Sequence, residues 1–194
     1  MAEIDDYLGN LYTATGDFGQ AALHLRQSLA FYEQENLDYV AVARVCASTA
    51  RMHEARGDMR QAEFFFSRAV AIERKQVPAG QKVTAAHIHL LSELTELGIF
   101  YVRRGDYARA DQLLGEVRAI GELAKAENYH IGGNVNLFAA SYALRGQYDR
   151  ALELAREALA SLNPREIERF LVLLQLGTIH TSKAEYAQAE HFLK

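Results

Sequence analysis

The sequence is short of several features that would define a function class. Its single cysteine, Cys46, excludes an intramolecular disulfide bond and suits a reducing compartment. No apolar run approaches the roughly 18 residues of a membrane span, and the N-terminus lacks the basic and apolar regions of a signal peptide. With a net charge of −4, the sequence lacks the excess of positive charge that would attract nucleic acid or an anionic membrane. These absences favour a cytoplasmic protein that binds neither nucleic acid nor a membrane directly.

The motifs of common active sites are also missing. There is no Gly-x-Ser-x-Gly, no phosphate loop ending in Gly-Lys-Ser/Thr and no His-Glu-x-x-His. Cys46 and His53 would lie about 10.5 Å apart along one helix, too far for a nucleophile and its base, so core packing is expected. His87 and His89 point in different directions on a helix and would need further ligands to hold a metal. We therefore predict a non-enzymatic protein with no catalytic residues, metal or cofactor.

What the sequence does have is one pattern that occurs five times. In the clearest copy, Leu97, Gly98 and Tyr101 fall on one helical face, Gly105 ends the helix and Ala110 begins the buried face of the next. Such self-similarity is the signature of a solenoid built from one repeated unit. The turn residues of the copies, at intervals of 41, 48, 41 and 38 residues, are Gly16, Gly57, Gly105, Gly146 and Ala184.

Local signals refine this pattern. Asp17, Asp58 and Asp106 directly follow the first three turns and are predicted to cap the helices that begin there. Pro78 lies in the longest interval and predicts a loop between repeats, with a hinge as the alternative. The Gly-Gly pair that begins at Gly132 stands where a helix should start and predicts a weakly formed, frayed helix end.

The five copies together resemble the tetratricopeptide repeat, in which Leu-Gly, Tyr, a Gly turn, Ala, an aromatic residue or Leu, and Ala occur in order. The first copy reads Leu8, Gly9, Tyr12, Gly16, Phe18, Ala21, Leu25 and Ser28. The third copy reads Leu94, Leu97, Gly98, Tyr101, Gly105, Tyr107, Ala110, Leu114 and Val117. The intervals exceed the usual period of about 34 residues. With these longer intervals the chain resembles the long-repeat variety found in kinesin light chains and in the sensor regions of bacterial transcription regulators.

The resemblance implies an all-α fold, a right-handed superhelical solenoid of antiparallel helix pairs. A single repeat domain is expected over residues 2–194, with repeats at 2–36, 37–77, 82–126, 129–163 and 164–194, the last incomplete. Solenoids normally end in a capping element with a polar outer face, and neither end of this sequence shows one. We therefore expect the sequence to be a fragment of a longer protein.

The resemblance also predicts where partners bind, because the first helix of each tetratricopeptide pair lines a concave groove for peptides or partner helices. Transferred position by position, that groove comprises Asn10, Arg44, Arg51, Glu54, Thr95, Ile99, Arg103, Asn136, Ala140, Leu171, Leu174 and Thr178. Its arginines and asparagines could bind a peptide backbone or carboxylate, and its apolar members could hold apolar side chains. An ordinary solvated face is the alternative.

One known specificity can be tested on the sequence. Repeat domains that clamp the C-terminal carboxylate of chaperones use a lysine-asparagine-asparagine-lysine-arginine set. Asn10 fits that set, but Asp6, Ser48 and Ser92 replace its lysine, asparagine and second lysine. Chaperone-tail binding is therefore not expected.

Two functions remain open at this point. The first is a scaffold or adaptor that binds protein or peptide partners in the groove. The second is a ligand- or peptide-sensing region of a larger regulator, bacterial and transcriptional, in which groove binding alters the superhelix.

The last repeat contains an apolar run. Residues 170, 172 and 173 are expected in the core, whereas Leu171 and Leu174 fall on the groove side. A missing repeat, a ligand or a second copy of the chain could cover that pair, and we expect self-association through the truncated C-terminal repeat.

Overall fold

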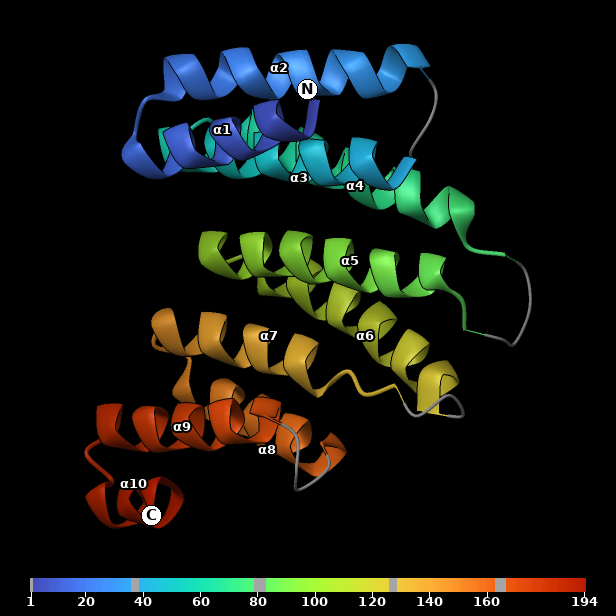
Figure 1. Ribbon diagram of the computed structural model, residues 1–194. Coiled ribbons are helices and arrows are strands. Elements are labelled where there is room, and N and C mark those ends of the chain that lie inside the picture. The colour runs from blue at the N-terminus through green and yellow to red at the C-terminus, as the bar shows by residue number, and fades with distance from the viewer. Residues whose placement is uncertain (1, 36–38, 79–82, 126–128, 163–166) are drawn as a thin grey trace. The chain divides into compact units, whose positions relative to one another are not determined.

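The computed structural model describes residues 2–35, 39–78, 83–125, 129–162 and 167–194, and it confirms the all-α class (Figure 1). Within these ranges the regular structure is helical and no strand occurs. The helices are α1 (Ala2–Thr15), α2 (Phe18–Glu35), α3 (Tyr39–Arg56), α4 (Met59–Gln76), α5 (Ala85–Arg104), α6 (Tyr107–Ala124), α7 (Gly132–Leu144), α8 (Tyr148–Ser161), α9 (Ile167–Ser182) and α10 (Tyr186–Leu193).

The helices belong to two compact units. Unit 1 comprises Met1–Gly80 and Thr84–Leu97, and unit 2 comprises Gln81–Val83 and Gly98–Lys194, so the division falls within α5. In unit 1, α1 pairs with α2 and α3 pairs with α4, and α1 and α2 also contact α3. In unit 2, α7 pairs with α8 and α9 with α10, and α9 contacts both α7 and α8. Each unit thus repeats the helix-turn-helix pair that the sequence predicted.

The turn within each pair uses a residue in the left-handed backbone region. Gly105 has φ 78°, its N–H donates to the Val102 carbonyl at 2.9 Å, and the N–H of Asp106 donates to the Tyr101 carbonyl at 3.0 Å. This pair of bonds satisfies carbonyls that the end of a helix leaves open. Ala184 makes the same turn at φ 59°, although a side chain disfavours that conformation. All five predicted turn residues have positive φ.

Two of the three predicted helix caps are confirmed. The carboxylate of Asp17 accepts a hydrogen bond from the N–H of Gln20 at 3.1 Å, at the start of α2. Asp106 accepts from the N–H of Arg109 at 3.2 Å, at the start of α6. In each case the side chain satisfies one of the N–H groups that the first helical turn leaves unpaired.

The third cap prediction, at Asp58, is wrong. Asp58 occupies the N-cap position of α4, but its side chain makes no capping hydrogen bond. Its carboxylate instead binds the guanidinium of Arg56, which stands two residues earlier, and lies 3.4 Å from Nδ1 of His53. The hydrogen bond from Arg56 holds the pKa of this carboxyl below its ordinary value. The ion pair with Arg56 forms through Oδ2 of Asp58, and the carboxylate as it is held there gives the first turn of α4 no capping bond.

The prediction of a frayed start at the Gly-Gly pair is also corrected. Gly132 is the first residue of α7 and is buried. A Cβ at this position would lie 2.5 Å from Cγ of Leu162, the residue that follows α8. Glycine is needed here because the start of α7 and the end of α8 approach more closely than a side chain allows.

Parts of the predicted domain map fall beyond the described ranges. The predicted repeat limits at 36, 37, 82, 126, 163 and 164 lie outside the described residues. Pro78 follows α4, and the remainder of its predicted loop or hinge, residues 79–82, lies outside them as well. Among the residues that are described, no helix combines the length and the apolar character needed to cross a membrane.

Candidate partner-binding surfaces

In unit 1, α1 and α3 join several predicted groove residues in one hydrogen-bonded network. The carboxylate of Asp6 is only 2% exposed, and it pairs with Nη1 of Arg44 at 3.1 Å. The Asn10 amide donates to the same carboxylate and to Oγ of Ser48, at 3.1 Å in each case. This contact joins residues 38 positions apart in the sequence. The buried charge of Asp6 is therefore both paired and hydrogen-bonded, as burial requires.

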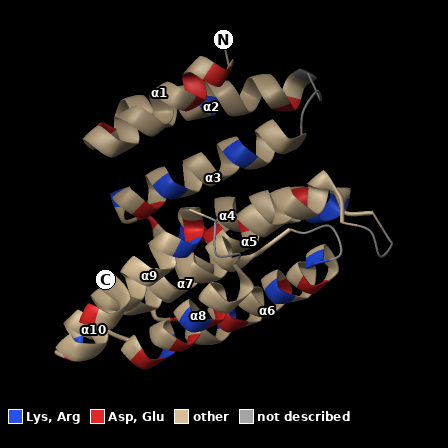
Figure 2. Cartoon of the chain, turned by 60° about the horizontal axis from the view of Figure 1, so that its bottom comes forward, with Lys and Arg blue, Asp and Glu red and all other residues tan. Residues whose placement is uncertain are grey.

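The network continues along α3 to the part of α5 that belongs to unit 1. Nη2 of Arg51 donates to Oγ of Ser48 at 3.2 Å, and Nη1 lies 3.5 Å from a carboxylate oxygen of Glu96. Arg44 and Arg51 are seven residues apart, so both lie on one face of α3. Figure 2 shows the basic positions along this helix in blue. The side chains of these two arginines are 39% and 41% exposed. The arginines thus keep donor groups available to a ligand while their positive charges are balanced.

A carboxyl group with an altered proton affinity lies beside this network. The pKa of Glu93 on α5 is raised to about 8. The largest cause is burial, and the second is the negative charge of Glu96. Arg51 opposes this effect, and Glu73 on α4, itself 1% exposed, adds to it. One Glu93 oxygen is buried and has no hydrogen-bond partner among the described residues. At neutral pH Glu93 is therefore mostly protonated and uncharged.

The other predicted groove residues of α3 and α5 differ in exposure. Glu54 is half-buried, one turn after Arg51 on α3. Thr95 is only 2% exposed, and its hydroxyl donates to the Leu91 carbonyl at 2.7 Å. Ile99 is 9% exposed, and Arg103 in the last turn of α5 is exposed. The structure thus places Thr95 and Ile99 among packed side chains, and leaves Glu54 and Arg103 accessible.

In unit 2, the predicted groove residues lie on α7 and α9, which contact each other. Asn136 and Ala140 are half-buried on α7. The amide oxygen of Asn136 is buried and has no hydrogen-bond partner in the described part of the chain. Such an unsatisfied acceptor costs about 1–3 kcal/mol. A donor from a bound partner would relieve that cost.

The face of α9 carries an apolar stripe. Leu171 is 51% exposed and Leu174 is 45% exposed, and Thr178, one turn later, is also exposed. Phe170, which the sequence predicts in the core, is 66% exposed, and Ile167 is 78% exposed. The core prediction for Phe170 is therefore wrong, because no described residue covers this side of α9. The spacing of 167, 170, 171 and 174 is that of a single helical face.

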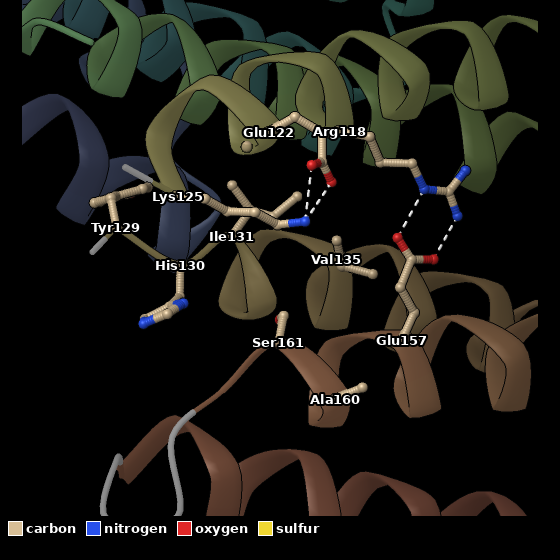
Figure 3. Close-up of a pocket in the computed structure, with 11 residues that line it drawn as sticks. Arg118, Glu122, Lys125, Tyr129, His130, Ile131, Val135, Glu157, Ala160 and Ser161 are labelled. Atoms are coloured by element: carbon tan, nitrogen blue, oxygen red, sulfur yellow. Dashed lines mark hydrogen bonds and ion pairs between the residues drawn. The ribbon is translucent and has the colours of Figure 1, made fainter. Parts of the chain in front are cut away.

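A cavity of about 490 Å³, which the sequence does not predict, lies elsewhere in unit 2 (Figure 3). Its charged lining is paired, since Arg118 binds Glu157 through both carboxylate oxygens and Lys125 donates to Glu122 at 2.7 Å. Burial raises the pKa of the Tyr129 phenol. The cavity is lined by Arg118, Gly121, Glu122, Lys125, Tyr129, His130, Ile131, Val135, Glu157, Ala160 and Ser161. These residues come from α6 and the residue that follows it, from α7 and the segment before it, and from α8, so no short motif in the sequence could have marked the cavity.

The candidate reactive residues are packed in the interior. Cys46 is fully buried, and burial raises the pKa of its thiol to about 11, which disfavours the reactive thiolate. His180 is 3% exposed, as expected for a core position, and His87 is 4% exposed. Across the described ranges, no group of three or more His, Cys, Asp or Glu residues could hold a metal ion.

Comparison with known proteins is consistent with this architecture. Residues 6–36 and 136–162 match the family model of the tetratricopeptide repeat. BtubC (BKLC) from P. vanneervenii has a TM-score of 0.69 at 19% identity, over 98% of this chain and 76% of that chain. The nearly identical TPR-like repeats of a putative kinesin light chain from Podosopora anserina have a TM-score of 0.66 at 21% identity, over 98% and 90%. No curated protein matches the sequence. At these identities the structural likeness concerns the fold alone.

Proposed function

We propose that this tetratricopeptide-repeat chain is a protein- or peptide-binding module that acts as a scaffold or adaptor. Folds of this family generally mediate protein–protein interaction and are typically non-catalytic. The observation that carries the proposal is the network of unit 1, in which the half-exposed Arg44 and Arg51 stand on α3 and polar contacts join α3 to α1 and α5.

The network suits a ligand that offers carboxylate or carbonyl oxygens. The 3.5 Å separation of Arg51 from Glu96 is longer than the 2.7–2.9 Å of a strong charged hydrogen bond. A partner oxygen that approaches Arg51 can therefore replace a weak contact at little cost. In unit 2, the unsatisfied amide oxygen of Asn136 would accept a hydrogen bond from a backbone N–H of the ligand. The exposed Leu171 and Leu174 would pack against apolar side chains of the ligand.

Capture of partners from a host lysate tests this proposal. Bound proteins and small molecules would be identified by mass spectrometry for the wild type and for Arg51→Glu. Arg60→Glu is the matched control, because it makes the same charge change at an exposed position of α4. We expect a protein partner to be retained by the wild type and the control, and to be lost by Arg51→Glu. Equal capture by all three would contradict the groove assignment.

The alternative, a sensing region of a larger regulator, draws support from the cavity in Figure 3. Its volume of about 490 Å³ falls in the range of about 300–1,000 Å³ that is usual for small-molecule sites. Ala160 is exposed and lines the cavity, so Ala160→Trp would fill it without disturbing the core. A small molecule recovered with the wild type but not with Ala160→Trp would favour the sensor.

The apolar stripe on α9 supports a further part of the proposal, self-association of the chain through its C-terminal repeat. Exposed apolar patches of this kind mark interaction surfaces. We expect light scattering to show an oligomer of the wild type that dissociates in the double variant Leu171→Ser, Leu174→Ser. A monomeric wild type at high concentration would contradict this part of the proposal, and would leave groove binding in unit 1 unaffected.

A further inference from the structure

His180 is held in one orientation within the last helix pair. Its Nδ1 lies 2.6 Å from a carboxylate oxygen of Glu185, and its ring stacks on Phe192 with centroids 5.5 Å apart. The pKa of Glu185 is lowered, mainly by the hydrogen bond from His180 and further by the one from Lys183. This carboxylate is therefore ionised and can only accept hydrogen bonds. Nδ1 must therefore carry a hydrogen. The orientation of the ring is set by groups that play no part in the proposed groove.

The other ring nitrogen of His180 is left without a partner. Nε2 is buried, and the described residues offer it no hydrogen bond. The side chain as a whole is only 4% exposed, so bulk water does not solvate this nitrogen freely. A buried polar atom in this state costs about 1–3 kcal/mol. A bound group that engages Nε2 would recover that cost.

His180 lines a cavity of about 380 Å³ that has an excess of hydrogen-bond donors. Arg156 on α8 makes no ion pair or hydrogen bond with any described residue, and the same holds for the Gln188 amide on α10. His191 adds a second imidazole at the rim. The lining contains no carboxylate and consists of Arg156, His180, Ala187, Gln188, His191 and Phe192. Its unpaired charge is positive, so the complementary group is an anion.

We propose that this cavity between α8 and α10 binds a compact oxyanion, the carboxylate or phosphate group of a ligand. Arg156 offers a planar fork of N–H groups that matches either oxyanion. His180 completes the site by donating from Nδ1 to Glu185 and from Nε2 to the anion. Ala187 and Phe192 provide apolar surface for an organic body attached to it. Arg156 and Gln188 come from second helices of their pairs. His180 comes from α9, a first helix, but nine positions after Leu171 it lies on the opposite face, so the site is separate from the groove side of α9.

Nitrogen-15 NMR of the histidine side chains in the full chain tests the proposal directly. The protein would be titrated with sodium phosphate and, separately, with sodium acetate, at constant pH and ionic strength. We expect a saturable shift of Nε2 of His180 to the protonated position, while Nδ1 stays protonated. Arg156→Gln is expected to weaken this binding by about tenfold, because it removes a charge-assisted contact. Since Arg156 is exposed, the variant retains the fold.

Two controls separate binding from general salt effects. Arg145→Gln removes the same charge from an exposed position of unit 2 outside the cavity and should leave the titration unchanged. His53 stacks on Phe65 in the same manner, but Phe64 stands where His191 would be, so its signals serve as a reference. Saturation by phosphate alone indicates a phosphate-bearing ligand, and saturation by acetate a carboxylate ligand. No saturable shift at His180, an equal shift at His53, or an unchanged response in Arg156→Gln would overturn the proposal.

Discussion

Gly98→Ala is expected to lower the free energy of unfolding of unit 2 by about 2 kcal/mol. A Cβ at Gly98 would lie 2.2 Å from Cζ and 2.5 Å from Cε1 of Phe138. Phe138 is 0% exposed, so its ring cannot move aside into solvent. Overpacking of this kind costs about 1–3 kcal/mol, and the better helix propensity of alanine returns about 1 kcal/mol at most. Urea denaturation followed by circular dichroism would measure the difference.

Gly115→Ala is the matched control for this prediction. Gly115 lies in the middle of α6, and a Cβ there would meet no atom within 4 Å. The same change at this position should therefore stabilise the protein by up to about 1 kcal/mol. The double variant Gly98→Ala, Phe138→Leu should recover part of the loss, because the smaller side chain makes room for the added methyl group. If Gly98→Ala stabilised the chain as much as Gly115→Ala, the close contact would be refuted.

Raising the pH from about 5.5 to about 8.5 is expected to weaken unit 1 through Glu93. Burial first, and then Glu96, raise the pKa of this carboxyl from 4.5 to about 8. Between these values the folded chain holds one proton more than the unfolded chain, so stability falls as the pH rises. The contribution is fully present below about pH 4.5 and is lost as the pH passes 8. The slope is at most about 1.4 kcal/mol per pH unit, and the whole effect is on the order of 3 kcal/mol.

Glu93→Gln isolates this effect, because glutamine resembles the protonated acid and does not titrate. Relative to the wild type, the variant should gain on the order of 3 kcal/mol in unfolding free energy between the two pH values. Urea denaturation at both values would show the gain. Glu3→Gln, at an exposed position of α1 in the same unit, controls for the loss of one negative charge. A constant difference between wild type and Glu93→Gln across this range would show that Glu93 is not buried as described.

The predicted groove residues depend both on local sequence spacing and on contacts between distant parts of the chain. The seven-residue spacing of Arg44 and Arg51 is enough to predict that both lie on one face of a helix. Their partners cannot be found in this way, because Asp6 and Glu96 come from other helices of unit 1. Which hydrogen-bonding groups are occupied, and which remain for a ligand, depends on those partners.

Burial is hardest to predict where a helix lacks a described neighbour on one side. The helical periodicity predicts that Leu171 and Leu174 lie on an exposed face, but it does not predict that Phe170 is exposed as well. Thr95 and Ile99 are assigned to the groove by their register, and the packing around α5 buries both. A helical register gives the direction of a side chain, while the elements packed against the helix decide whether that side is covered.

The helix pairs, their turns and two of the caps follow from the amino-acid sequence alone. These features depend on neighbours a few residues apart, such as the left-handed Gly105 and the carboxylate of Asp106 three residues before the N–H of Arg109. The raised pKa of Glu93, the unsatisfied Nε2 of His180 and the cavity lined in part by Arg118 and Glu157 arise only in the folded chain. The physical reason is that desolvation and hydrogen-bond pairing depend on groups that the fold brings together, and Arg118 and Glu157 are 39 positions apart in the chain.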